Sequence, residues 1–137
     1  MNIFFTASIR GGRENLPAFE RIVRVLERYG TVHAPHIADA SVSEYGETDT
    51  PDAEILTREL AALVACDIVV AEVTTPSLGV GYFIARATDA GKKVLALYRG
   101  QNTLKLSAPI KGDPRVSVHL YKDENEIEGV LKTAFSA

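Results

Sequence analysis

Residues 67–73 (DIVVAEV) constrain the fold more than any other stretch of this chain. The run is apolar and β-branched without polar alternation, which is typical of a central strand that is covered on both faces. Residues 74–81, which we name the Ser77 turn, follow with two glycines and a serine, and residues 81–90 are expected to form a helix. The stretch therefore predicts a buried strand, a glycine-bearing turn and a helix in direct succession.

The Ser77 turn is a candidate anion site. A glycine-containing turn at the start of a helix presents unpaired backbone N–H groups and the positive end of the helix dipole. Open α/β folds bind their ligands at the carboxyl ends of the strands, which is where this turn is expected to lie. Ser77 and Gly79 are the candidate anion-binding residues of the turn.

A second polar, glycine-bearing turn follows the first predicted strand, residues 2–7. This turn, residues 8–13 (SIRGGR), is named the Ser8 turn. It offers hydroxyl, guanidinium and backbone N–H donors for a phosphate, although an ordinary polar turn is the alternative. Neither turn matches the fingerprints for dinucleotides or nucleoside triphosphates, so we predict a monophosphate ligand and neither NAD nor ATP. The candidate ligand residues here are Ser8, Ile9, Arg10, Gly11 and Gly12.

Strands and helices are expected to alternate along the whole chain. Such alternation predicts a parallel sheet in a doubly wound, three-layer α/β sandwich. We expect five strands in the flavodoxin-like order 2-1-3-4-5, in which the Ser8 and Ser77 turns face each other across one crevice. No linker or repeat is apparent, so residues 1–137 are expected to form a single domain. The expected strands are 2–7, 31–34, 67–73, 93–98 and 116–121, and the expected helices are 15–30, 50–66, 81–90 and 123–135.

The helix over residues 50–66 is expected to place a carboxylate at the wall of the crevice. Thr50 is expected to cap this helix, with Pro51 as its first residue. Glu59 lies at the edge of the apolar face, which is expected to pack on the sheet, and a surface charge is the alternative for this residue. The expected apolar face consists of Ile55, Leu56, Leu60, Leu63 and Val64.

The connection over residues 35–50 is long enough to suggest a lid or a binding loop, with simple disorder as the alternative. His36 is expected to face the crevice, unless it is a solvated loop histidine. The acidic residues of this segment are interpreted as solvated charges, and Glu72 at the end of the third strand as a structural residue. Those loop acids are Asp39, Glu44, Glu47 and Asp49.

Composition excludes several classes of protein. With 15 basic and 18 acidic residues, the chain has no excess of positive charge to bind nucleic acid or acidic membranes. Its three histidines lack ligand spacing and Cys66 is the single cysteine, so we predict no metal, no disulfide and no cofactor. No apolar run approaches the ~20 residues that span a bilayer, and no signal sequence is apparent. We expect a cytoplasmic protein.

Three separated motifs resemble those of one family. They are residues 4–13 (FFTASIRGGR), 70–82 (VAEVTTPSLGVGY) and 106–112 (LSAPIKG). Together they are similar to the 2′-deoxynucleoside 5′-monophosphate N-glycosidases, relatives of the nucleoside 2-deoxyribosyltransferases, over nearly the whole chain. The resemblance implies a flavodoxin-like sheet, a homodimer, and a nucleoside 5′-monophosphate ligand with His36 beside it. The implied 5′-phosphate pocket consists of Ser8, Arg10, Ser77 and Gly79, with Ser107 reaching in from the partner subunit.

This chain departs from the family at the catalytic positions. The family's nucleophilic glutamate matches Phe83, the tyrosine that hydrogen-bonds it matches Phe4, and the aspartate that assists the departing base matches Glu59. A phenylalanine can act neither as a nucleophile nor as a general base. The rings of Phe4 and Phe83 could instead pack against a sugar or a base.

Two functions follow from these departures. The first is a nucleoside 5′-monophosphate-binding protein with lost or altered glycosidase chemistry. The second is a divergent N-glycosidase in which Glu59 acts as the nucleophile or as a base that activates water. We favour the first because a catalytic group misplaced by about 1 Å can cost ~100-fold in rate. A purely structural protein would leave the phosphate-binding residues unexplained, and whether the chain is an enzyme stays open.

Overall fold

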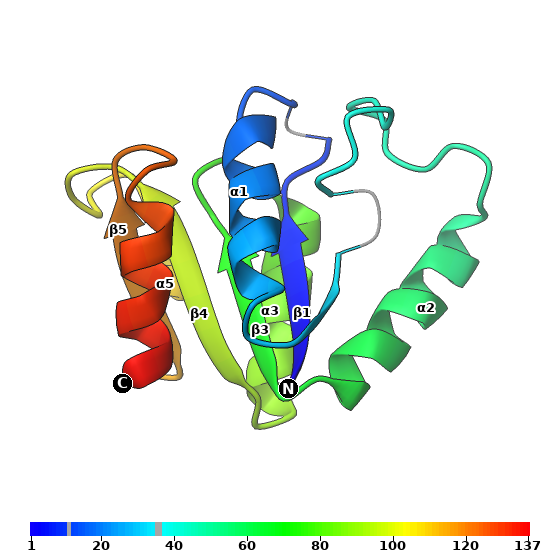
Figure 1. The fold of residues 1–137 in the computed structure, drawn as a ribbon. Coiled ribbons are helices and arrows are strands. Elements are labelled where there is room, and N and C mark those ends of the chain that lie inside the picture. The colour runs from blue at the N-terminus through cyan, green and yellow to red at the C-terminus, as the bar shows by residue number, and fades with distance from the viewer. Residues whose placement is uncertain (11, 35–36) are drawn as a thin grey trace.

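The computed structural model describes residues 1–10, 12–34 and 37–137 of the chain. Five parallel strands form a single sheet in the order β2-β1-β3-β4-β5, of which β1, β3, β4 and β5 are labelled in Figure 1. The predicted parallel sheet and its strand order are confirmed. The strands are β1 (Asn2–Ala7), β2 (Thr31–His33), β3 (Ile68–Glu72), β4 (Lys93–Arg99) and β5 (Val116–Tyr121).

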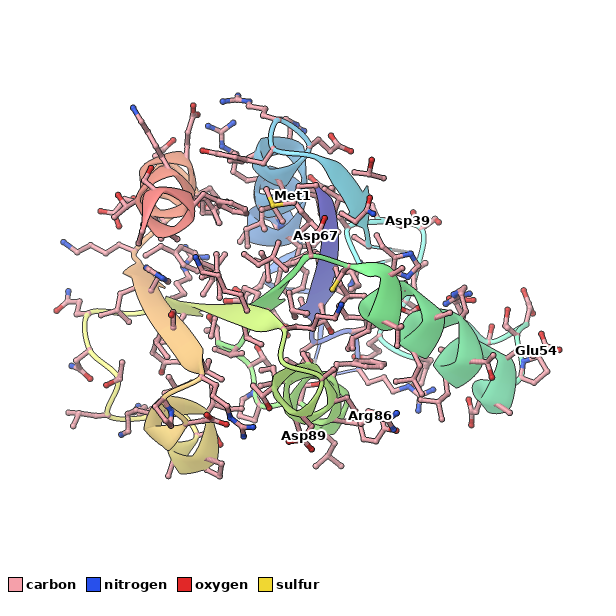
Figure 2. The ribbon with its side chains drawn as sticks, turned by 90° about the horizontal axis from the view of Figure 1, so that it is seen from below. Met1, Asp39, Glu54, Asp67, Arg86 and Asp89 are labelled. Carbon is pink, nitrogen blue, oxygen red and sulfur yellow. The ribbon has the colours of Figure 1, made fainter. Side chains whose placement is uncertain are left out.

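Helices cover both faces of the sheet, which gives the expected three layers (Figure 2). One face carries α1 (Leu16–Leu26) and α5 (Ile127–Ser136). The other carries α2 (Asp52–Ala65), α3 (Leu78–Asp89) and α4 (Ala108–Gly112). Within the described part of the chain, none of these helices has the length and apolarity needed to cross a membrane.

The central strand β3 explains why its sequence lacks alternation. Ile68 and Val70 belong to the apolar core under α1 and α5. Val69 and Ala71 belong to the core under α2 and α3. Every residue of the strand is buried, because helices cover both of its faces.

Three helix boundaries differ from the predictions by three or four residues, and one of them is the start of α5, at Ile127 rather than at residue 123. The helix α1 ends at Leu26 rather than at Gly30, and the chain leaves it through a turn in which Tyr29 N donates to Leu26 O. The helix α3 begins at Leu78, three residues earlier than predicted, because the Ser77 hydroxyl accepts a hydrogen bond from Val80 N at 3.3 Å. Glycines that were interpreted as turn residues therefore lie in the first helical turn.

Helix α2 packs less fully than its sequence predicts. It begins after Pro51, and no side chain caps it, so the predicted Thr50 cap is wrong. Leu56 and Val64 are 40% and 67% exposed, although both were expected to face the sheet. The N-terminal part of α2 leans away from the sheet (Figure 1), so part of its apolar face meets solvent. Glu59, which was expected at the edge of that face, is buried instead.

A buried carboxylate joins three strands at the carboxyl edge of the sheet. Glu72 at the end of β3 accepts hydrogen bonds from the Tyr121 hydroxyl, at 2.9 Å, and from the Thr74 hydroxyl. Thr74 Oγ1 in turn accepts from Arg99 N at 2.8 Å. Burial raises the pKa of Glu72 above its ordinary value, and the two hydroxyl donors oppose that rise. The predicted structural role of Glu72 agrees with these contacts.

We predict that Glu72 makes the protein less stable as pH rises. Its folded-state pKa lies above the ordinary value of 4.5, so its contribution is present below that pH and is lost as pH rises through the folded pKa. Glu72→Gln should remove this loss. The melting temperature of the variant minus that of the wild type should therefore increase as pH rises. Thermal unfolding followed by circular dichroism from about pH 4 to 8 measures this difference. Glu54→Gln, at an exposed carboxylate, is the control, and equal pH slopes for Glu72→Gln and wild type would contradict the prediction.

Candidate functional site

A cavity of about 540 Å³ lies at the carboxyl ends of β1 and β3. Its lining comes from the end of β1, the Ser8 turn, the loop after β2, helix α2 and the start of α3. Residues far apart in the sequence thus meet around one hollow, as the switch point of this strand order predicts. The predicted site residues among the lining are Ser8, Ile9, Arg10, Glu59, Ser77, Gly79 and Phe83.

The other predicted site residues lie elsewhere. Phe4 is a buried core residue that packs under Phe83 and does not line the cavity. Gly12 is also absent from the lining, and its φ of +110° is a conformation that favours glycine. Ser107 lines a neighbouring cavity. The remaining two candidates, Gly11 and His36, fall outside the described residues.

One end of the cavity is formed by the start of α3. The Ser77 hydroxyl already caps this helix through Val80 N. The backbone N–H groups of Leu78 and Gly79, the first two residues of the helix, have no carbonyl partner within it. They add to the positive end of the helix dipole, and Arg10 lines the same cavity. This end of the cavity can therefore hold a phosphate.

The wall formed by α2 carries a network of charged side chains. Glu59 Oε1 accepts from Arg58 Nε at 2.9 Å, and Glu59 Oε2 lies 3.2 Å from His33 Nε2. The Arg58 guanidinium also donates to both carboxylate oxygens of Glu47, at 3.1 and 2.5 Å. The hydrogen bond with Glu47, supported by Glu59, raises the pKa of Arg58. Arg58 therefore stays positively charged between two carboxylates.

The cavity floor is aromatic. Phe83 lines the cavity, and its ring makes an edge-to-face contact with the ring of Phe4, at a centroid distance of 5.5 Å and an interplanar angle of 61°. The ring of Phe4 also stacks on His33, at 5.6 Å and an interplanar angle of 16°. Such a floor offers contact area to a sugar or a base and provides no proton acceptor.

The loop after β2 covers part of the cavity. Arg13 Nη2 donates to the backbone carbonyls of Ile37 and Asp39, both at 2.9 Å. Farther along, Glu47 is held by Arg58, and Ile37 and Glu47 both line the cavity. The described part of this loop, residues 37–50, is therefore anchored near both of its ends.

Sequence reasoning missed the network on α2. Glu47 was interpreted as a solvated loop charge, whereas Arg58 binds it. His33 was excluded only as a metal ligand, and its contact with Glu59 across the fold was not predicted. One signal could have pointed to His33, because the predicted strand order places the end of the second strand beside the first strand. The observed register pairs His33 with Phe4.

A second cavity, of about 620 Å³, lies beside the first between α3 and α4. The two cavities share Ser77 and Leu78 in their linings, and Ser107 belongs to the second. Leu78 and Leu104 are 96% and 83% exposed. Within residues 1–10, 12–34 and 37–137, no group of three or more His, Cys, Asp or Glu residues is arranged to hold a metal ion.

Known proteins share both the sequence and the fold of this chain. The 5-hydroxymethyl-dUMP N-hydrolase of Mus musculus is 46% identical over 140 residues, which cover 99% of this chain and 80% of the relative. The protein of the same name from Danio rerio is 42% identical over 138 residues, which cover 98% and 96%. A Clostridium botulinum CMP N-glycosidase has the same fold, with a TM-score of 0.68 at 19% identity, covering 98% of this chain and 99% of the other.

The match extends to a whole protein family. The family model described as nucleoside 2-deoxyribosyltransferase matches residues 3–127, which include all of the sheet except the first residue of β1. The two N-hydrolases also align with almost all of this chain. This chain therefore belongs to the nucleoside 2-deoxyribosyltransferase family.

Proposed function

We propose that this chain binds nucleoside 5′-monophosphates in the cavity between the Ser8 and Ser77 turns. The proposal rests on one observation above all, the convergence of Ser8, Arg10, Ser77 and Gly79 on a single cavity. A hydroxyl-bearing turn, a guanidinium and a helix N-terminus together suit a phosphate group. Names of the relatives, which refer to nucleoside monophosphates, support the same class of ligand.

The dimensions of the cavity agree with a nucleotide. Phe83 follows Gly79 by four residues on α3, which is about 6 Å along the helix axis. A phosphate at the helix start would therefore place the sugar near the ring of Phe83. The base would then lie toward the wall that carries Arg58 and Glu59.

The proposed binding function includes lost or altered glycosidase chemistry. Phe83 supplies no carboxylate at the floor of the cavity, and Phe4 supplies no hydroxyl beneath it. Both oxygens of Glu59 are already engaged, by Arg58 and by His33. A carboxylate bound by a guanidinium is a weaker nucleophile than a free one, because its charge is shared with the donor.

A second candidate function is hydrolysis of the bond between base and sugar. It is favoured by the position of Glu59 in the lining and by the hydrolase activity in the names of the relatives. Glu59 would remove a proton from water, whose oxygen bonds to the anomeric carbon while the carbon–nitrogen bond breaks. The departing nitrogen takes up a proton, and the products are the free base and the sugar 5-phosphate.

We also propose a homodimeric, single-domain and cytoplasmic protein. The dimer is supported by the high exposure of Leu78, which lines the second cavity, and of Leu104, two residues before the lining residue Leu106, since exposed apolar surface marks interaction sites. In such a dimer Ser107 would face the phosphate of the partner subunit.

The single-domain proposal is supported by one sheet with one core on each face. The cytoplasmic proposal is supported by the single cysteine, which is buried and suits a reducing compartment.

Removing the Arg10 guanidinium is expected to weaken binding of nucleoside 5′-monophosphates by about tenfold or more. The loss of a charge-assisted hydrogen bond to phosphate costs about 1.5–3 kcal/mol. Isothermal titration calorimetry with Arg10→Ala measures the change, and Arg24→Ala, at an exposed arginine of α1, is the matched control. The free nucleoside should bind both variants equally. An unchanged nucleotide affinity in Arg10→Ala would contradict the phosphate site.

Assays of base release decide between the two candidate functions. A panel of ribo- and deoxyribonucleoside 5′-monophosphates is incubated with the wild type, with Glu59→Gln and with the control Glu54→Gln, and free base is quantified by chromatography. The binding function predicts micromolar affinity with no release by any of the three. Release that Glu59→Gln lowers by about 100-fold or more, and Glu54→Gln does not, would support the hydrolase instead.

Charged substitutions at the exposed leucines are expected to separate the proposed dimer. Leu78→Asp and Leu104→Asp together would place two carboxylates in an apolar interface, where unpaired charges are strongly unfavourable. Light scattering coupled to size-exclusion chromatography should give twice the chain mass for the wild type and the chain mass for the double variant. Tyr45→Asp, at an exposed aromatic residue of the loop after β2, should remain dimeric. A monomeric wild type would refute the dimer.

A further inference from the structure

The carboxylate of Glu59 has an unexpected partner behind the cavity wall. His33 is the last residue of β2, and its Nε2 lies 3.2 Å from Glu59 Oε2. The imidazole ring stacks on Phe4, which lies opposite His33 in the register of β1 and β2. The stack sets the plane of the ring, and the strand sets its position. The plane and the position of the imidazole ring are therefore set by the sheet and not by α2.

Glu59 is held from two sides. Arg58 Nε donates to Oε1, while His33 faces Oε2. Arg58 is itself anchored by Glu47 from the loop after β2. Because a carboxylate has about four lone-pair sites, each oxygen keeps capacity to accept a hydrogen bond from a ligand. The network thus fixes the orientation of Glu59 without filling the acceptor positions that it can offer to the cavity.

We infer that His33 is a positioning residue for Glu59. His33 does not line the cavity, so any effect on a ligand has to pass through the carboxylate that does. A glutamate loses rotamer entropy when it is ordered, and donors on both oxygens provide that order before a ligand arrives. The inference rests on the proposed function, since it assigns Glu59 to the half of the nucleotide beyond the phosphate.

His33 and Arg58 hold Glu59 from different elements of the fold. Arg58 lies on the same helix as Glu59 and moves with it, whereas His33 belongs to the sheet that also carries the Ser8 turn. His33 therefore ties the wall of the cavity to the strand that precedes the phosphate site. If the chain is a hydrolase, the same contact would orient the Glu59 carboxylate toward the attacking water. Loss of the contact would then lower kcat more than it changes KM.

Two substitutions separate the hydrogen bond from the ring stack. His33→Phe keeps an aromatic ring on Phe4 and loses the nitrogen, while His33→Gln restores an N–H donor toward Glu59. Calorimetry with 2′-deoxyuridine 5′-monophosphate should show about a five- to tenfold weaker affinity for His33→Phe and near recovery for His33→Gln. In the Glu59→Ala background, His33→Phe should cause no further loss. Equal losses in both backgrounds would overturn the inference, as would a His33→Gln variant no better than His33→Phe.

Two further measurements keep this test separate from that of the proposed function. Binding of 2-deoxyribose 5-phosphate, which lacks the base, reports the phosphate site and should be the same in wild type and His33→Phe. If neither ligand binds the wild type, the proposed function fails. Proton–nitrogen NMR of the ligand-free protein then still tests the pair: a protected Nε2–H signal of His33 should be present in the wild type and lost in Glu59→Ala. Its absence from the wild type would refute the contact.

Discussion

Parallel pairing between β1 and β3 is the constraint on which the site depends. The register runs from Ile3 opposite Ile68 to Ala7 opposite Glu72, so both strands end at the same level of the sheet. The Ser8 and Ser77 turns therefore begin side by side, although about seventy residues separate them in the sequence. The chain leaves β1 through α1 on one face of the sheet and leaves β3 through α3 on the other face. The point between the two strand ends therefore stays open, and the cavity lies there.

Much of this arrangement could be predicted because it follows from local patterns. The unbroken apolar run of β3 indicated a strand covered on both faces, and alternation of elements then fixed a parallel sheet. The two turns were recognisable from their glycines and hydroxyl residues. Contacts across the fold were not predictable in this way. The exposed side of α2 depends on the tilt of that helix, and the partners of Glu59 come from β2 and from the preceding residue of α2.

The site joins two parts with different chemistry. At the end where we propose that the phosphate binds, backbone N–H groups and Arg10 supply donors that any nucleoside 5′-monophosphate can use. At the other end, two phenylalanines and a clamped glutamate stand where the resemblance implied a nucleophile, its hydroxyl partner and an aspartate. The departures are linked in space, since Phe4 touches both Phe83 and the histidine that faces Glu59.

The loose packing of α2 has a consequence for selectivity. The proposed phosphate end is built on β1, β3 and the first turn of α3, whose side chains enter the two cores. The opposite wall stands on a helix that buries only Glu59 and Leu63 and leaves apolar side chains in water. The first end of the cavity is thus anchored in both cores, whereas the opposite wall is held mainly by the polar contacts of Arg58 and Glu59. We infer that selectivity among bases depends on these few polar contacts, while the other end serves the group that all ligands of the class share.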